Sequence, residues 1–307
     1  MKKLYINANC QGPACKQMLS EVLTDWRIES LPVHEPHSED TLKSVREFIS
    51  QADAIVSQPI SNSYSITEFR SDSIRNLARS TALIEWFPSI YFTGQQITLC
   101  TLKHNGKRLN TPGWLYHDCI VAFLIAEGLE IEQVVEHMMD RELFSKSWVE
   151  EEVCRIVSEN INREKELGCT ITGSQLFANQ IASRVLCHTF NHPVRFVLAH
   201  VCNSIISLIG RNENVSDKGT DFLRYPHYPM LPSVAFHLGE IYNIENFLFH
   251  WKSKSLTFDE YIRSMFRSYR NLDKDLILAA LSETQGVPNL IHKFRQYPSR
   301  PISPLKS

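Results

Sequence analysis

The stretch LYINANCQGPACKQML, residues 4–19, gives the first evidence of the fold. Leu4–Ile6 is a short apolar run of the kind found in buried strands, and the turn-forming residues NANCQGP follow it. Over Ala14–Trp26, apolar side chains recur at helical spacing. The stretch therefore predicts a strand, a turn and a helix, with Cys10 on the turn.

The same alternation of strand and helix continues along the first part of the chain. Helices are predicted after Ser38, which can cap a first turn, and over Ile66–Ser80. Further strands are predicted over Ile28–Val33, Asp53–Ser57 and Ala82–Phe87. Strands that alternate with helices predict a small parallel sheet.

A different pattern begins at Tyr91. Residues 91–112 contain Asn105-Gly106, the residue pair typical of a type I′ hairpin turn. From Gly113 on, the chain is mainly helical, as in Ile120–Ala126, a helix that Gly128 ends. We therefore predict an α/β protein that is predominantly helical. It has a small parallel sheet in the N-terminal region, an inserted subdomain containing a β-hairpin, and a helical C-terminal part.

Capping patterns predict where the later helices begin. Capping boxes are formed by Ser147 with Glu150, Thr172 with Gln175, and Thr257 with Glu260. Asn191 is a further cap residue, with Pro193 in the first turn of an apolar helix that runs to Gly210. The chain is thus expected to divide into residues 1–90 (the α/β region carrying the Cys10 turn), 91–112 (the hairpin), 113–290 (the helical region) and 291–307 (a proline-rich tail).

Composition excludes several classes of protein. The chain has 307 residues, of which 43% are apolar, and 32 basic residues nearly balance 34 acidic ones. A balanced charge creates no general field for nucleic acid. No apolar run approaches the roughly 20 residues that span a bilayer. The apolar stretch near the N-terminus is too short for a secretory signal, so a cytoplasmic protein with reduced cysteines is expected.

Cys10 is the first candidate for a catalytic role. Parallel sheets form their sites at the carboxyl ends of the strands, and the N-terminus of a helix lowers the pKa of a nearby thiol. Cys10 is therefore a candidate nucleophile, while most free cysteines are small buried hydrophobes. A zinc site with Cys15, His34 and His37 is a weaker alternative, because the spacings match no standard ligand pair.

Two groups of polar residues are further candidates. Ser57 and Gln58 follow the strand Asp53–Ser57, so they are expected at the same sheet edge as Cys10, as hydrogen-bond donors to an oxyanion or as a simple strand end. His117 is a candidate base or phosphate ligand. A role as a helix cap would be enough to explain Asp118, which follows it.

His192 and the hairpin tip complete the candidates. His192 is expected at a rigid helix entrance, where the helix dipole favours a neutral imidazole that acts as a base, although a structural histidine fits as well. Lys103, Lys107 and Arg108 gather positive charge at the hairpin, either as a solvated tip or as ligands for phosphate groups.

Five short motifs in register resemble the WcbI-type capsular polysaccharide biosynthesis family. They lie between about residues 4 and 240 and read Asn9-Cys10-Gln11, VSQPI at 56–60 with Tyr64, FPSIYFTGQQI at 87–97, Tyr116-His117-Asp118 and TFNHP at 189–193. The resemblance implies a mainly helical protein with an inserted subdomain. It also implies binding of coenzyme A and acetylation of a capsule sugar, a 6-deoxy-heptose in the type member.

The resemblance and the residue chemistry together define the expected site. Acetyl-CoA is the co-substrate, a sugar hydroxyl is the acceptor, no metal takes part, and capsule biosynthesis proteins are potential partners. Cys10, His192, His117 and Gln11 are the expected catalytic residues. The expected substrate and CoA ligands are Asn9, Gly12, Ser57, Gln58, Tyr64, Tyr91, Phe92, Gly94, Lys103, Lys107, Arg108, Tyr116 and Asn191.

The mechanism and two other functions stay open at the level of sequence. Cys10 can carry the acetyl group as a thioester, or it can line the pocket while the group passes directly to the sugar. An acetyl esterase similar to the SGNH hydrolases would cleave simple acetyl esters without binding CoA. A CoA-binding scaffold of capsule assembly would bind CoA without turnover.

Overall fold

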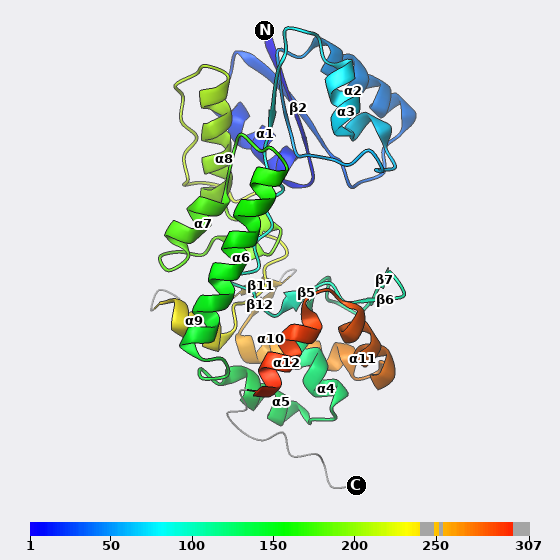
Figure 1. Cartoon of the computed structure of the whole chain (residues 1–307), viewed down its shortest axis with the longest axis vertical. Coiled ribbons are helices and arrows are strands. Elements are labelled where there is room, and N and C mark those ends of the chain that lie inside the picture. The colour runs from blue at the N-terminus through cyan, green and yellow to red at the C-terminus, as the bar shows by residue number, and fades with distance from the viewer. Residues whose placement is uncertain (240–248, 252–253, 297–307) are drawn as a thin grey trace. The chain divides into compact units, whose positions relative to one another are not determined.

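The computed structural model describes residues 1–239, 249–251 and 254–296, and the chain divides into two compact units (Figure 1). The first unit comprises Met1–Phe92, Val157–Gln180 and Leu186–Arg224. The second comprises Thr93–Ile156, Ile181–Val185 and Tyr225–Ser307. Each unit is therefore assembled from stretches that are separate in the sequence. The division expected from the sequence had only consecutive segments.

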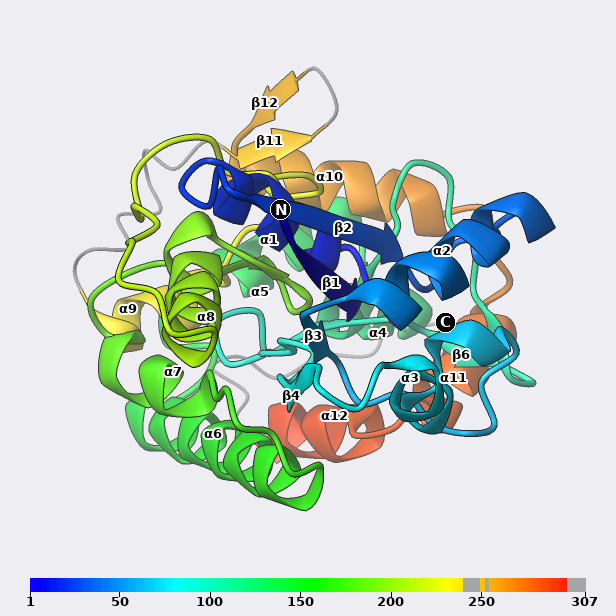
Figure 2. The ribbon, with the colours of Figure 1, turned by 90° about the horizontal axis from the view of Figure 1, so that it is seen from above.

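A four-stranded parallel sheet forms the centre of the first unit. Its strands are β1 (Lys2–Ala8), β2 (Trp26–Pro32), β3 (Ala54–Ser57) and β4 (Leu83–Trp86). They lie in the order β2-β1-β3-β4, and every neighbouring pair is parallel (Figure 2). Because the inner strands are covered on both faces, they read as apolar runs such as AIV in β3. The predicted small parallel sheet is confirmed.

Helices cover both faces of this sheet. The helix α1 (Gln11–Ser20) packs on β1 and β2, and α8 (Arg195–Leu208) packs on α1. On the other face, α2 (Glu39–Gln51) and α3 (Ser71–Leu77) enclose an apolar cluster around Tyr5 and Phe69 (Figure 1). The unit also contains the 3₁₀ turn η1 (Thr67–Phe69), α7 (Ser174–Gln180), the hairpin strands β9 (Cys187–Thr189) and β10 (His192–Pro193), and part of the long helix α6 (Lys146–Glu166).

Two predicted helices of the N-terminal region are shorter than expected. The helix α1 ends at Ser20, and Trp26 begins β2 instead, because its backbone pairs with Lys2 and its side chain is buried. The predicted helix over 66–80 is divided into η1 and α3. Arg70 separates the two with an extended backbone, so the helical ladder cannot continue.

Three predicted helix starts are wrong. His192 and Pro193 pair with β9, so α8 starts at Arg195 and neither Asn191 nor Pro193 belongs to its first turn. The helix α6 starts at Lys146, and Ser145 Oγ accepts a hydrogen bond from Trp148 N. At α7, the Glu164 carboxylate accepts from Gly173 N and Ser174 N in place of a Thr172 cap.

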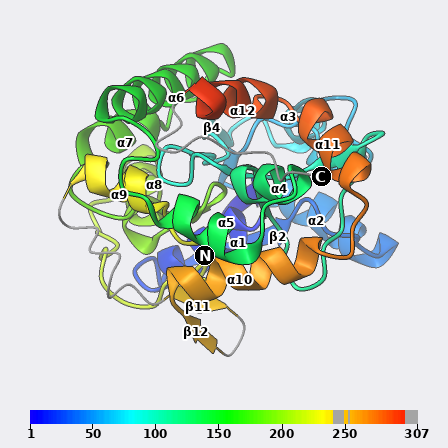
Figure 3. The ribbon, with the colours of Figure 1, turned by 90° about the horizontal axis from the view of Figure 1, so that it is seen from below.

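The second unit is a helical assembly around α4 (Cys119–Ala126). All eight residues of α4 are buried, and α5, α10, α11 and α12 surround it (Figure 3). These helices are α5 (Ile131–Met139), α10 (Phe258–Tyr269), α11 (Lys274–Glu283) and α12 (Val287–Gln296), and α9 (Pro232–Leu238) packs near α5. Residues 291–296 are therefore helical and not part of a tail, while 297–307 lie outside the described residues.

Short strand pairs complete the second unit. They are β5 (Leu99–Cys100) with β8 (His117–Asp118), β6 (Lys103–His104) with β7 (Lys107–Arg108), and β11 (Phe249–Trp251) with β12 (Lys254–Leu256). Asn105 and Gly106 both have positive φ between β6 and β7, which confirms the predicted hairpin turn. The capping box of Thr257 and Glu260 is also confirmed. In the described part of the chain, no helix has the length and apolar character needed to cross a membrane.

Candidate functional site

Three loops meet at the carboxyl edge of the parallel sheet. The turn Asn9-Cys10-Gln11 follows β1, Gln58 follows β3, and Ser89-Ile90 follows β4. Asn9 N donates to Gln58 Oε1 at 3.0 Å, and Asn9 Nδ2 donates to Ser89 Oγ at 3.0 Å. The sequence therefore placed Gln58 correctly beside the Cys10 turn.

Gln11 joins these loops through every hydrogen-bonding position of its side chain. It is completely buried. Its Nε2 donates to the carbonyls of Ile90 (2.9 Å) and Asn191 (3.1 Å), while its Oε1 accepts from Ile90 N (3.0 Å) and Gln58 Nε2 (3.1 Å). An amide has two donors and two acceptor positions. Gln11 therefore acts as a rigid cross-link, and this geometry does not favour the expected role as an oxyanion donor.

Cys10 sits at the N-cap of α1 with a half-buried thiol. Burial raises its pKa to about 11, although the backbone N–H groups of Cys10 and Gln11 act in the opposite direction. The helix N-terminus was expected to lower this pKa, but desolvation of the thiolate outweighs it. Cys10 is therefore held as a neutral thiol, with Sγ 4.0 Å from Asn9 Oδ1.

Gly12 lets α1 approach the sheet closely. A Cβ atom at this position would lie 2.5 Å from Ser30 Oγ and 3.0 Å from Ala8 Cβ. Gly12 therefore serves the packing that places the Cys10 turn, and only a residue without a side chain fits there.

Ser57 and Tyr64 are held by bonds within the fold. Ser57 is completely buried, donates to Gln58 O at 2.8 Å and accepts from Asn7 Nδ2 at 3.0 Å. Tyr64 donates its hydroxyl to Val33 O at 2.6 Å and packs against the cluster of Tyr5 and Phe69. Both side chains thus stabilise the loops around the site.

The hairpin β9–β10 is anchored to the same edge. Its turn residue Asn191 receives the bond from Gln11, and Phe92 N donates to Phe190 O at 2.6 Å. Tyr91 is 41% exposed, and its ring contacts that of Phe190 with centroids 5.0 Å apart. The structure therefore brings the expected residues of FPSIYF and TFNHP to the Cys10 turn.

An Asp–His pair lies beside this hairpin, and the sequence did not predict it. His188 Nε2 is 2.8 Å from Asp221 Oδ2, and both side chains are largely buried. Burial raises the pKa of Asp221. The hydrogen bond and charge of His188, together with two backbone N–H groups, lower it by more, so the pKa lies below its usual value. No local pattern connects the two residues, which lie in separate segments of the chain.

The candidates in the second unit are described by themselves. His117 is buried, with Nδ1 2.5 Å from the Tyr269 hydroxyl and Nε2 2.9 Å from Leu109 O. Burial lowers its pKa to about 4. Asp118 caps α4 by accepting from Ile120 N and Val121 N. His117 and Asp118 therefore have structural partners that account for them.

The remaining candidates of this unit differ in exposure. Tyr116 and Gly94 are buried, and Tyr116 N donates to the Tyr228 hydroxyl at 2.8 Å. Lys103, Lys107 and Arg108 are exposed on the β6–β7 hairpin, and Lys103 N donates to Thr284 Oγ1 at 3.0 Å. Their ammonium and guanidinium groups are thus available to solvent and to anions.

A comparison with family models decides the classification of the chain. The model of the polysaccharide biosynthesis enzyme WcbI matches residues 3–214. The chain belongs to the WcbI family. The membership implied by the five sequence motifs is therefore confirmed, and the chain is a member of a family of polysaccharide biosynthesis enzymes.

A solved structure of WcbI has the same fold. It matches with a TM-score of 0.80 and 17% sequence identity, covering 95% of this chain and 99% of that chain. That structure is the native protein without a disulfide bond between coenzyme A and one of its cysteines. A comparison with curated proteins finds no match. The predicted α/β, mainly helical fold is thus the fold of the WcbI family.

The zinc alternative has no support in this fold. Within residues 1–239, 249–251 and 254–296, no three His, Cys, Asp or Glu side chains are grouped as a metal site would need. Cys15 is fully buried, and the thiol of Cys202 lies 3.9 Å from its carbonyl oxygen. Cys15 therefore belongs to the packing of α1 against α8.

Proposed function

We propose that this member of the WcbI family is an acetyl-CoA-dependent O-acetyltransferase that acetylates a sugar hydroxyl, on a 6-deoxy-heptose, in capsular polysaccharide biosynthesis. The observation that supports this most is Cys10, a half-buried thiol on a turn that is fixed from two sides by Gln58 and Gln11. The solved structure of WcbI is the native protein without a disulfide bond between coenzyme A and one of its cysteines, and we infer that this cysteine lies near the CoA sulfur. Cys10 is our candidate for the equivalent contact.

Placing the CoA sulfur beside Cys10 explains why a thiol suits this turn. A disulfide between CoA and a protein requires the two sulfur atoms to come within bonding distance. In acetyl-CoA the same sulfur carries the acetyl group. The thioester would then lie at the carboxyl edge of the sheet, where α/β proteins bind their ligands.

The raised pKa of Cys10 favours direct transfer over a covalent intermediate. With a pKa of about 11, only about one thiol in 10⁴ is ionised near pH 7, and the thiolate is the attacking species. Direct transfer needs a base for the sugar hydroxyl and no thiolate. In this route Cys10 lines the thioester pocket, and the acetyl group passes straight to the sugar.

Of the two predicted bases, we favour His192 over His117. His192 lies on the hairpin anchored to the Cys10 turn, whereas the low pKa and the buried partners of His117 favour a structural role. The exposed cations Lys103, Lys107 and Arg108 remain our candidates for binding the CoA phosphates.

Titration of the purified protein with CoA and acetyl-CoA tests the proposal. We expect binding of both, and acetyl transfer when a 6-deoxy-heptose acceptor is added. Substituting Lys103, Lys107 and Arg108 together by alanine should weaken CoA binding, while alanines at the exposed Lys43 and Lys165 should leave it unchanged. Hydrolysis of acetyl esters without CoA affinity would indicate an esterase, and CoA binding without turnover on any acceptor would indicate a scaffold.

Cys10→Ser separates the two chemical routes. For direct transfer we expect the variant to retain most of its activity, and the wild type to show no gain of an acetyl mass on Cys10 during turnover. Cys154→Ser is the matched control, because Cys154 is exposed on α6. Loss of activity in Cys10→Ser together with an acetylated Cys10 peptide in the wild type would establish the covalent route instead.

A further inference from the structure

We propose that a pocket beside α8, here named the α8 pocket, binds a neutral sugar unit of the saccharide that is acetylated. This inference rests on the proposed function, because it concerns the acceptor of the same reaction. The pocket has a volume of about 340 Å³, and its lining comes from α7, α8 and the loop that follows α8, all within the first unit. Its volume is at the lower end of the range of about 300–1,000 Å³ that small-molecule sites have.

One side of α8 lines the α8 pocket. Four lining residues recur at the spacing i, i+3, i+4 and i+7, which places them along one stripe of a helix: Phe196, Ala199, His200 and Asn203. Elsewhere α8 is largely apolar and buried, as at Val201, and the helix packs on α1. The helix therefore has one side that stabilises the fold and another side that brings polar groups to the pocket.

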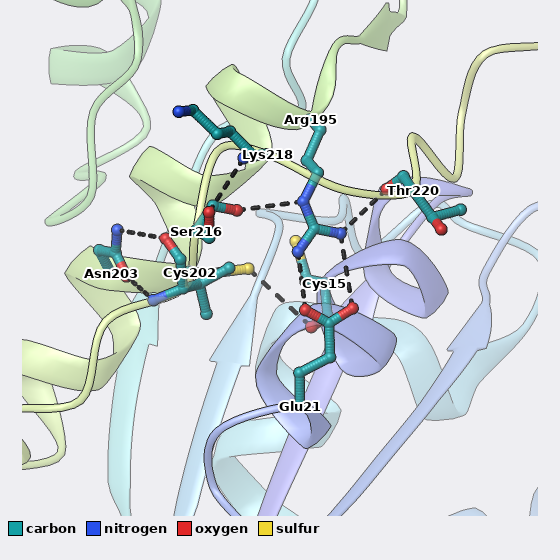
Figure 4. Close-up of polar contacts among 9 residues, drawn as sticks. Cys15, Glu21, Arg195, Cys202, Asn203, Ser216, Lys218 and Thr220 are labelled. Atoms are coloured by element: carbon teal, nitrogen blue, oxygen red, sulfur yellow. Dashed lines mark hydrogen bonds and ion pairs between the residues drawn. The ribbon is translucent and has the colours of Figure 1, made fainter.

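The loop that completes the lining is held by Asn203 (Figure 4). Asn203 Nδ2 donates to Val215 O at 3.2 Å, and its Oδ1 accepts from Val215 N at 2.7 Å. The amide thus pairs with the backbone of Val215 as a neighbouring strand would, and the Val215 side chain is buried. An amide has two donors and two acceptor positions, so Asn203 keeps one of each for a ligand.

Arg195 fastens the next part of the same loop (Figure 4). Its guanidinium donates to the carbonyls of Ser216 (3.0 Å) and Thr220 (2.9 Å). It also pairs at 2.7 Å with Glu21, at the end of α1. The loop is thus held in position without a ligand. Such preorganisation lowers the entropy cost of binding.

His200 adds a hydrogen-bond acceptor to the lining. It is exposed, and its Nε2 lies 3.1 Å from Thr172 O. A carbonyl can only accept a hydrogen bond, so in neutral His200 the proton is on Nε2 and Nδ1 carries a lone pair. Within the described residues Nδ1 has no hydrogen-bond partner. This lone pair can therefore accept a hydrogen bond from a hydroxyl group of a ligand.

The lining of the α8 pocket suits hydroxyl groups better than phosphates. Asp217 contributes a carboxylate, and the described residues of the lining include no Lys or Arg. A negative charge without a cation disfavours the phosphate groups of CoA. A sugar hydroxyl can donate to Asp217 or accept from the amides of Asn203 and Asn214. Apolar lining residues such as Leu176 can contact the C–H groups of the sugar ring.

The β9–β10 hairpin connects the α8 pocket with the Cys10 turn. Asn191 O in the hairpin turn accepts from Gln11, and Phe196 follows Asn191 by five residues. Five residues span at most about 18 Å, even when fully extended. A saccharide of a few units is therefore long enough to contact both segments, and we expect the pocket to hold a unit other than the one that is acetylated.

An NMR titration of the full-length ¹⁵N-labelled protein tests binding without the need for activity. The probe is a disaccharide of 6-deoxy-heptose, and inorganic phosphate is the comparison. We expect the side-chain amide signals of Asn203 and Asn214 to shift with the disaccharide and not with phosphate. The signal of Asn212, an exposed residue outside the lining, should stay unchanged. Shifts with phosphate alone, or no shift at Asn203 and Asn214 with the disaccharide, would overturn the inference.

Steady-state kinetics with the same disaccharide test its part in the reaction. His200→Ala and Asn214→Ala should each raise the KM for the disaccharide about two- to tenfold, the effect of one hydrogen bond, with kcat and the KM for acetyl-CoA unchanged. The matched controls His34→Ala and Asn212→Ala change exposed residues outside the lining and should behave as the wild type.

The outcomes separate this inference from the proposed function. If the wild type neither binds CoA nor transfers acetyl to any acceptor, the proposed function fails, and the NMR titration still decides whether the α8 pocket binds the disaccharide. If the wild type transfers acetyl and both pocket variants keep its KM for the disaccharide, only this inference fails.

Discussion

At the scale of single residues, Gln11 illustrates how a polar side chain can fix a site without taking part in its chemistry. Its amide connects the backbone after β4 and the β9–β10 turn, and it also bonds the Gln58 side chain. Buried polar groups are costly when their partners are removed. The rigidity of the Cys10 turn therefore depends on a residue whose neighbours come from distant parts of the sequence.

Gln11→Ala should lower the free energy of unfolding by about 2–4 kcal/mol, because several buried donors and acceptors lose their partner. Gln17→Ala on the same helix is the control, since Gln17 is exposed, and it should change stability by less than about 0.5 kcal/mol. Urea denaturation followed by circular dichroism measures both. Equal effects of the two substitutions would contradict the cross-link.

His117 should make stability depend on pH. Unfolded His117 takes up a proton near pH 6.5 and the folded residue only near pH 4, because burial disfavours the charge. Between these values the unfolded state binds more protons, so the stabilisation by His117 is present above pH 6.5 and is lost as the pH falls toward 4. Burial also raises the pKa of the neighbouring Asp118 to about 6. Asp118 is present in both the wild type and the variant His117→Gln, so its contribution cancels when the two are compared.

The test is the difference in unfolding free energy between the wild type and His117→Gln. We expect the substitution to cost more at pH 7.5 than at pH 4.5, with most of the change between pH 6.5 and pH 4. Urea titrations at four pH values in this range provide the measurement. A difference that stays constant across the range would rule out the buried neutral imidazole.

At the scale of elements, the packing of α1 on the sheet depends on the absence of a side chain at Gly12. Ser30 Oγ in β2 occupies the space into which a Cβ would project. The helix α1 also begins directly at the Cys10 turn, so a displacement of the helix moves the thiol. The strand-turn-helix element therefore couples core packing to the site.

Gly12→Ala should destabilise the protein by about 1–3 kcal/mol, the usual effect of overpacking. Removing the closest atom with Ser30→Ala should restore part of that loss, although Ala8 Cβ at 3.0 Å remains. A double-mutant cycle measures the coupling. Additive effects of the two substitutions would show that α1 moves away from the sheet and does not press against Ser30.

At the scale of the whole molecule, the first unit cannot be completed by the N-terminal part of the sequence alone. Thr170 N and Ile171 N donate to Trp86 O at the end of β4, and α8 covers α1. These partners belong to Val157–Gln180 and Leu186–Arg224. The predicted segment 1–90 is therefore only part of a folding unit.

A fragment of residues 1–92 should not unfold cooperatively by itself. Without α8, the helix α1 loses an element that packs on it, including the contact of Cys202 with Cys15 O, and part of its buried apolar surface becomes exposed. Circular dichroism in urea should give a broad, non-sigmoidal transition for the fragment and a cooperative one for the full chain. A cooperative transition of the fragment would contradict the requirement for the later segments.

The sequence by itself determined the local structure of this protein. The parallel sheet, the Asn105-Gly106 turn, the caps at Asp118 and Thr257 and the position of Cys10 at a strand end follow from periodicity and from short-range hydrogen bonding. The turn and the caps depend on residues that are neighbours in the chain, and the sheet was inferred from the local alternation of its strands and helices, although its strands pair over 24 to 50 residues. The family motifs likewise indicated the WcbI family.

The tertiary structure alone decided which distant residues act together. It placed Gln11 among Gln58, Ile90 and Asn191, brought Asp221 to His188, and divided the chain into two discontinuous units. It also decided that burial outweighs the helix N-terminus in the pKa of Cys10. Burial and long-range hydrogen bonds depend on which segments meet in space, and the order of residues along the chain does not encode that locally.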